Sequence, residues 1–322
     1  MSTRPEFKVA DRPDTWAARV VGSVATATES LGAFPLTVRS LQRAARKQSG
    51  LPDLDPHELD EPLRCLEEDF AQNPPSDFGR MAIHLTLSYG LQNRIRTQHA
   101  ERPDLRIPRR PPVIIAGWYR TGTTFLQALM EAIPGYSFLR MHELMNPTHR
   151  KSGRIRAELS TRLMNRVTPE LTVLHPVSAT SPEECWQILL QNMLIDGMAI
   201  HWDVPQTAQW LHDVDRVPAY RNWARNLALL EDRLGHGLIL KDPAHMVALP
   251  AIIEAIPDAR IIWTHRDPKD CLASYGSLSA VQHRMMYGKY DPERAGRVTL
   301  RDMDYSFRAG MAARDQIPSG QL

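Results

Sequence analysis

One stretch of the sequence decides the fold, and it reads Val113-Ile114-Ile115-Ala116-Gly117-Trp118-Tyr119-Arg120-Thr121-Gly122-Thr123-Thr124. It opens with a short apolar run rich in β-branched residues, which is typical of a buried strand in a parallel sheet. Gly117 and Gly122 then keep the Gly-x4-Gly spacing of a loop that cradles phosphate between a strand and a helix. A helical pattern follows over residues 123–130 and closes at Pro134-Gly135. The stretch therefore predicts a strand, an anion-binding loop and a helix, in that order.

The same alternation returns near the C-terminal end. Residues 238–240 and 259–264 predict two further strands, and residues 244–256 and 268–280 predict the helices that follow them. Alternating β and α elements with apolar strands imply a parallel sheet covered by helices. We therefore predict an α/β fold: a P-loop-like parallel sheet flanked by helices.

The remaining segments read mainly as helices. Residues 1–108 predict a helical N-terminal cap, and residues 109–322 the α/β core. Within the cap the expected helices lie in residues 14–47, 56–71 and 78–99. In the middle of the chain they lie around residues 158–166, 182–198 and 219–234.

Composition narrows the function classes. The 322 residues are 43% hydrophobic and 24% charged, as in ordinary globular proteins, and the net charge of +2 provides no field for nucleic acid. The sequence contains no signal-peptide pattern and no uncharged apolar run of about 18 residues, which argues against a transmembrane segment. Cys65, Cys185 and Cys271 lie far apart and offer no metal-ligand spacing. We expect a cytoplasmic protein without a metal site.

Each of the three predicted strands ends at a basic residue. Arg120 follows the first strand, and the segments Lys241-Asp242-Pro243 and Arg266-Asp267-Pro268 follow the others. Asp is a good helix N-cap and Pro suits the first helical position, so both segments predict a helix start. Ligands of parallel sheets bind beyond the carboxyl ends of the strands, where helix N-termini present free N–H groups. The three cations are therefore expected to converge on one polyanion.

The first loop differs from that of a nucleotide triphosphatase. Such an enzyme needs Lys at position 123 to reach the outer phosphates, whereas Thr123 stands here and the cation lies within the loop as Arg120. This difference argues against a P-loop small-molecule kinase, which stays an alternative because it shares the fold. A catalytically inactive nucleotide-binding protein is another alternative.

These motifs resemble those of one family. Arg120-Thr121-Gly122-Thr123-Thr124 resembles the 5′-phosphosulfate-binding loop of sulfotransferases, and residues 266–274 resemble their 3′-phosphate-binding segment. Between them, residues 240–245 resemble a segment of the bacterial branch. The resemblance spans residues 110–280. It implies sulfuryl transfer from 3′-phosphoadenosine 5′-phosphosulfate (PAPS) to a hydroxyl of a small-molecule or lipid-like acceptor.

The resemblance also implies roles for single residues. Arg120, Thr121, Gly122, Thr123 and Thr124 would hold the 5′-phosphosulfate. Lys241 belongs to the same catalytic set. Arg266 and Ser274 would bind the 3′-phosphate. Phe125 stands where the family commonly places an aromatic ring against adenine, although a core position on its helix is an equal interpretation.

Two residues compete as the general base that the acceptor hydroxyl needs. Glu143 resembles the Glu that several sulfotransferases place after the first helix, and His245 loosely resembles the base histidine of another branch. We favour Glu143. Glu183 and Glu184, which precede Cys185-Trp186, are interpreted instead as acidic residues at a helix start, where they suit the helix dipole.

In the resembling proteins a further strand and helix usually follow at the point where this sequence ends. We therefore expect an exposed sheet edge there, with a cost in stability. The acceptor's identity and the oligomeric state do not follow from these motifs.

Overall fold

Four short strands form one parallel sheet in the order β2-β3-β1-β4. The strands are β1 (Val113–Ala116), β2 (Tyr136–Phe138), β3 (Gly237–Lys241) and β4 (Arg260–Trp263). The computed structural model describes residues 34–52, 57–318 and 320–322. Within these ranges the predicted parallel sheet is confirmed, and β2 is an additional strand at one edge.

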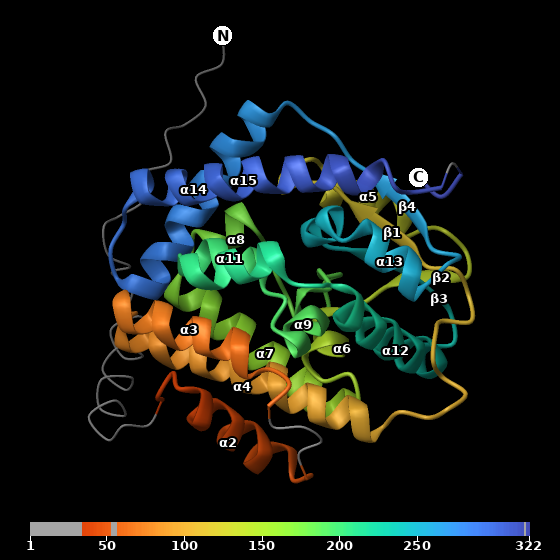
Figure 1. Ribbon diagram of the computed structural model, residues 1–322, viewed down its shortest axis with the longest axis horizontal. Coiled ribbons are helices and arrows are strands. Elements are labelled where there is room, and N and C mark those ends of the chain that lie inside the picture. Colours follow the sequence, from red (N-terminus) through yellow and green to blue (C-terminus); the bar gives the residue numbers. More distant parts are fainter. Residues whose placement is uncertain (1–33, 53–56, 319) are drawn as a thin grey trace.

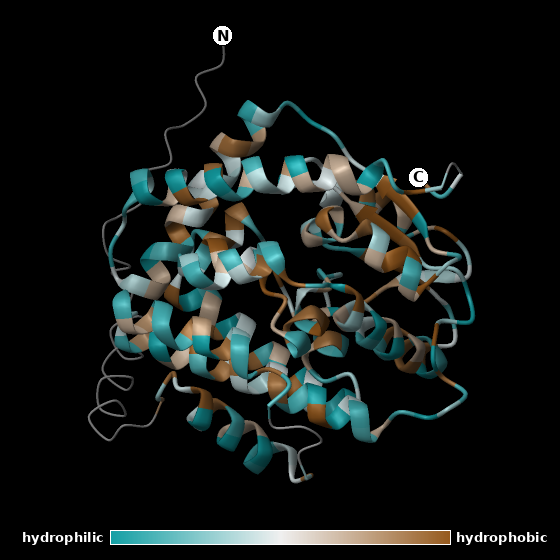
Figure 2. Ribbon diagram, in the orientation of Figure 1, coloured by the Kyte–Doolittle hydropathy of each residue, from teal (hydrophilic) through white to brown (hydrophobic). Residues whose placement is uncertain are grey.

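Strand β1 lies at the centre because both of its faces are apolar. Ile114 and Ile115 are fully buried, and they belong to two hydrophobic clusters on opposite faces of the sheet. Val113 lies opposite Ile239 of β3 and Arg260 of β4. This register aligns the carboxyl ends of all three strands. Figure 2 shows the strands coloured as hydrophobic, as expected for a sheet covered on both faces.

Helices surround the sheet and extend well beyond it (Figure 1). Up to the middle of the chain they are α2 (Val38–Ser49), α3 (Asp60–Gln72), α4 (Asp77–His99), α5 (Thr123–Met130), α6 (Met141–Met145), α7 (Arg150–Val167), α8 (Leu171–Leu174), α9 (Trp186–Leu189) and η1 (Leu190–Asn192). They continue with α10 (Asp196–Trp202), α11 (Pro205–Asp213), α12 (Val217–Leu234), η2 (Pro243–Val247), α13 (Leu249–Ala255), α14 (Pro268–Tyr287) and α15 (Pro292–Arg314).

The N-terminal helices pack directly on the rest of the protein. Leu63 of α3 and Ile83 of α4 belong to the same hydrophobic cluster as Ile114 of β1. Ser76, the N-cap of α4, donates its backbone N–H to the carbonyl of Met286 at the end of α14. Helices α2, α3 and α4 lie in the described part of the predicted cap, residues 100–108 are not helical, and residues 1–33 and 53–56 lie outside the described residues. The division of the chain after residue 108 stays a prediction.

One predicted helix is wrong. Residues 182–198 do not form a continuous helix, because the N–H groups of Glu183 and Cys185 donate to the carbonyls of Leu139 and Lys241. Helix α9 begins only at Trp186, and the chain turns again at Met193, whose φ is 58°. The segment 183–185 is therefore tied to the end of β3. The predicted helix over 244–256 is likewise divided into η2 and α13.

The C-terminal residues contact the free edge of the sheet. The N–H of Ile261 in β4 donates to the carbonyl of Gln321 at 2.7 Å, and the Gln321 side chain donates to the carbonyl of Pro257. The edge that we expected to be exposed is thus partly covered by the end of the chain itself. Of the helices in the described ranges, none combines the length and apolar character needed to cross a membrane.

Candidate functional site

The loop between β1 and α5 has the backbone conformation of an anion cradle. Gly117 and Gly122 have φ angles of 136° and 96°, and Arg120, which is not glycine, also has a positive φ of 67°. A side chain at Gly117 would clash with Thr264, whose Oγ1 would lie 2.4 Å from the added Cβ. At Gly122 an added Cβ would meet nothing within 4 Å, so the space above the loop is open. A positive φ at a residue other than glycine is costly and is often found at functional sites.

Arg120, Arg266 and Ser274 come together as predicted. The Nε of Arg120 donates to the Oγ of Ser274 at 3.0 Å, across 154 residues of sequence. The Nη1 of Arg266 donates to the backbone carbonyl of Arg120 at 3.3 Å. The predicted convergence of the first and third strand ends is therefore confirmed.

Lys241 joins the same site from the second strand end. Its Nζ lies 3.0 Å from Oε1 of Glu184 and 3.4 Å from Oγ1 of Thr124, and its side chain is only 3% exposed. Burial lowers the pKa of Lys241, but the negative charges of Glu184 and Glu183 outweigh this and raise the pKa above its ordinary value. The ammonium is therefore charged and links the loop to the carboxylate of Glu184.

Two adjacent carboxyl groups at this site have pKa values that are shifted in opposite directions. Burial and the charge of Glu184 raise the pKa of Glu183. Burial also tends to raise the pKa of Glu184, but Lys241 and His175 outweigh it and the pKa is lowered. Glu184 is thus ionised at neutral pH. Opposite shifts in neighbouring groups are characteristic of acid–base sites, although structural ion pairs produce them too.

These groups open onto one large cavity of about 660 Å³. Arg120, Gly122, Thr123, Thr124 and Arg266 line it together with Glu183, Glu184 and Asp242. The other walls come from α4, α6, α7 and α14 and are mainly apolar. Seven of the 13 methionines of the sequence line this cavity. A cavity of this size and character suits a small-molecule ligand.

Phe125 lies on the first turn of α5 and is 71% exposed. A core residue would be buried, so the interpretation of Phe125 as a core position is wrong. The exposed ring is free to contact a ligand bound at the loop.

Neither of the two predicted bases lines this cavity. The Oε2 of Glu143 accepts a hydrogen bond from the N–H of Arg140 at 2.8 Å, so its buried carboxylate caps helix α6. His245 is fully buried, and its Nδ1 lies 2.9 Å from the hydroxyl of Tyr220. Burial lowers the pKa of His245 to about 3, so its imidazole is neutral at pH 7.

The carboxylates that do line the cavity were missed by sequence reasoning. The sequence pattern predicts that Glu183 and Glu184 begin a helix, but they lie before α9, in a non-helical segment bonded to Leu139 and Lys241. One signal was available, because a pair of acidic residues followed by the mostly apolar run Cys185-Trp186-Gln187-Ile188-Leu189 places charge beside buried structure. The lysine that pairs with Glu184 lies 57 residues further along the chain, so local sequence patterns could not predict the pairing.

Comparison with known proteins identifies the family and the fold. The family described as the sulfotransferase family matches residues 111–322. The structure resembles the crystal structure of sulfotransferase STF1 from Mycobacterium tuberculosis H37Rv with a TM-score of 0.74 and 26% identity, over 88% of this chain and 82% of that one. It also resembles sulfotransferase STF9 from Mycobacterium avium in fold, with a TM-score of 0.76 and 23% identity, over 88% and 76% of the two chains. No curated protein matches the sequence.

Proposed function

Because the chain belongs to the sulfotransferase family, we propose that it transfers a sulfuryl group from PAPS to a hydroxyl group of an apolar small-molecule or lipid-like acceptor. The observation that carries this proposal is that Arg120, Arg266 and Ser274 meet beside a largely apolar cavity, which Arg120 and Arg266 help to line. An anionic donor needs a cationic site and an apolar acceptor needs an apolar one, and transfer between them needs the two sites side by side.

The residues at the strand ends fit a bis-anionic nucleotide. Arg266 and Ser274 would hold the 3′-phosphate. Arg120, Thr123 and Thr124 would hold the 5′-phosphosulfate over the open space at Gly122, where the first N–H groups of α5 add donors. Phe125 offers its exposed ring to the adenine. Lys241 links Thr124 of the loop to the carboxylate of Glu184.

Sulfuryl transfer resembles phosphoryl transfer, in which the enzyme mainly positions groups and neutralises charge. As the bond from sulfur to the acceptor oxygen forms, the bond from sulfur to the 5′-phosphate oxygen breaks and leaves negative charge there. Arg120 lies beside that position and stabilises the charge electrostatically, because a guanidinium does not readily donate a proton. The acceptor's hydroxyl proton must pass to a base.

We propose Glu184 as this base in preference to Glu143 or His245. Glu184 lines the cavity, is ionised, and is held by Lys241. Its carboxylate can accept the acceptor's proton while Lys241 keeps its orientation. Glu143 and His245 are occupied in a helix cap and in a buried contact with Tyr220.

The acceptor is expected to be apolar around its hydroxyl. Helices α4, α7 and α14 face the cavity with flexible aliphatic side chains: Met81, Leu85, Leu163, Met164, Met285 and Met286. Methionine-rich walls adapt to ligands of different shapes. Such a wall favours sterols, phenols or long-chain alcohols over sugars.

The direct test is transfer of radiolabelled sulfate from PAPS to a panel of sterols, phenols, long-chain alcohols, glycolipids and sugars. We expect a labelled product with at least one apolar alcohol and none with free sugars. Donor binding without any labelled product across the panel would instead indicate a catalytically inactive nucleotide-binding protein.

A second measurement separates this function from that of a P-loop kinase. The product nucleotide 3′-phosphoadenosine 5′-phosphate (PAP) should raise the melting temperature, whereas ATP with Mg²⁺ should have little effect because Thr123 replaces the P-loop lysine. The opposite ranking would favour the kinase.

The three cysteines are free thiols, which supports the cytoplasm as the proposed location.

A further inference from the structure

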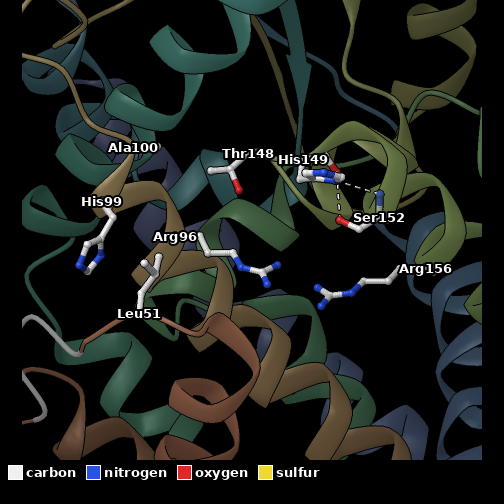
Figure 3. Close-up of a pocket in the computed structure, with 8 residues that line it drawn as sticks. All are labelled: Leu51, Arg96, His99, Ala100, Thr148, His149, Ser152 and Arg156. Carbon is white, nitrogen blue, oxygen red and sulfur yellow. Dashed lines mark hydrogen bonds between the residues drawn. The ribbon is translucent and has the colours of Figure 1, made fainter.

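A second cavity, of about 590 Å³, lies between α4 and the beginning of α7. Figure 3 shows its lining: Leu51, Arg96, His99, Ala100, Thr148, His149, Ser152 and Arg156. Arg96 and His99 come from α4, whereas His149 is the N-cap of α7 and Arg156 lies on its second turn. The cavity is thus separate from the loop between β1 and α5.

The lining of this cavity carries positive charge without a carboxylate. The guanidinium groups of Arg96 and Arg156 point toward each other from the two helices in Figure 3. Burial lowers the pKa of Arg156, and the positive charge of Arg96 lowers it further, which agrees with their proximity. Two like charges that face each other in a half-buried site are unfavourable unless an anion lies between them.

The other contacts of the two arginines are to neutral groups. The Nη2 of Arg96 donates to the carbonyl of Gln48 at 3.0 Å. Arg156 donates to the side chain of Gln92, and its guanidinium lies 4.2 Å from the centre of the Tyr89 ring. Within the described ranges the Nη1 of Arg156 is buried and has no hydrogen-bond partner. That nitrogen is closed off from the cavity, but a guanidinium carries five N–H donors, and within the described ranges Arg96 uses only the one to Gln48, so donors remain for a ligand.

The beginning of α7 provides two further features that favour an anion. The Nδ1 of His149 accepts the N–H of Ser152 at 3.3 Å, so the ring hydrogen lies on Nε2, which is a donor. The N-terminal end of an 18-residue helix also carries a partial positive charge.

We propose that this cavity binds a phosphate- or sulfate-type oxyanion between Arg96 and Arg156. A guanidinium pair offers the forked donors that such an anion prefers. Arg156 also lines the large cavity. The oxyanion can therefore be a free ion or the acidic group of an ester whose apolar part extends toward that cavity.

The experiment titrates inorganic phosphate into the full chain by isothermal calorimetry, with the proposed donor site first saturated with PAP. We expect one saturable site, and Arg96→Gln and Arg156→Gln should each weaken it about tenfold or more. Arg162→Gln is the matched control, because Arg162 is an exposed arginine of α7 outside the cavity. It should leave phosphate binding unchanged.

A second titration identifies the source of the anion. Octyl phosphate that binds much more tightly than inorganic phosphate, and loses affinity in Arg156→Gln, would indicate an ester that reaches the large cavity. Equal affinities for the two probes would indicate a free ion. Both results support the site.

The variants also keep this inference distinct from the proposed function. Arg266→Ala removes a proposed donor contact and should leave this phosphate site intact, so a protein that fails to bind PAP can still be tested here. Circular dichroism establishes that each variant is folded, and Arg96→Lys, which keeps the charge, should retain intermediate affinity. The proposal is overturned if phosphate does not bind saturably to the wild-type chain, or if folded Arg96→Gln and Arg156→Gln both bind it like wild type.

Discussion

The two ends of the large cavity are built in different ways. At the ionic end, Arg120, Lys241 and Arg266 follow three neighbouring parallel strands, and backbone geometry places them together. At the apolar end, side chains of α4, α7 and α14 meet from segments far apart in the sequence. The ionic end depends on a loop backbone conformation that few sequences adopt, whereas the apolar end needs only flexible aliphatic side chains that fill the space. We therefore expect mutations at the ionic end to abolish chemistry and those at the apolar end to shift acceptor preference.

The largest effect is expected at the ionic end, from Glu184→Gln. If Glu184 accepts the acceptor's proton, kcat should fall about 10²- to 10⁴-fold while PAP binding changes little. Single-turnover transfer and calorimetry with PAP measure the two quantities. Glu143→Gln is the matched carboxylate change, and a Gln at this position retains the helix cap. A larger loss of kcat in Glu143→Gln than in Glu184→Gln would reverse the assignment.

A smaller effect is expected from residues of the ionic end that bind the donor nucleotide and take no part in the chemical step. Arg266→Ala should weaken PAP binding about 10- to 100-fold, because a charge-assisted contact is removed at a partly exposed position. Arg266 also pairs with Asp270 at 3.1 Å, so Asp270→Ala serves as a control for loss of that ion pair. Unchanged PAP affinity in Arg266→Ala would contradict the assignment of the 3′-phosphate site.

At the apolar end, Leu163→Ala should raise the acceptor KM about five- to tenfold, because apolar contact area is lost. The affinity for PAP should stay the same. Leu300, exposed on α15, provides the control substitution Leu300→Ala. An equal fall in donor affinity would show that the two ends do not act independently.

The last expected effect is on stability rather than on activity, and it concerns a contact behind the ionic end. Asp302 accepts a hydrogen bond from Nε1 of Trp118, in the loop, at 3.1 Å. Desolvation raises the pKa of Asp302 from 3.8 to about 7, although the Trp118 contact opposes this. Because the folded state holds this proton more tightly than the unfolded state, its stabilising contribution is full below pH 3.8 and is lost as the pH rises through 7.

Asp302→Asn should therefore make stability less dependent on pH between about pH 4 and pH 7, where the wild-type slope is at most about 1.4 kcal/mol per unit. Urea unfolding at several pH values measures this slope. Identical slopes in the two proteins would mean that Asp302 does not titrate in this range.

The ionic end could be predicted from the sequence because its signals are local. Gly117, Gly122 and the Asp-Pro helix starts specify turns through their own backbone preferences, and parallel strands then bring their ends to one edge. The carboxylate proposed as the base could not be predicted, since Glu143 and Glu184 are both acidic residues near apolar segments. Only the backbone contacts of Glu183 and Cys185 with Leu139 and Lys241 distinguish them.

The sequence by itself determined the strand–loop–helix units and the cations that end each strand, because dihedral preferences and capping act over a few residues. Tertiary structure alone decided which carboxylate faces the cavity, which helices wall it, and that Arg96 and Arg156 face each other. Those outcomes depend on contacts between residues that are distant in sequence. Many different apolar side chains can fill such contacts, so a local sequence pattern does not specify which residues meet.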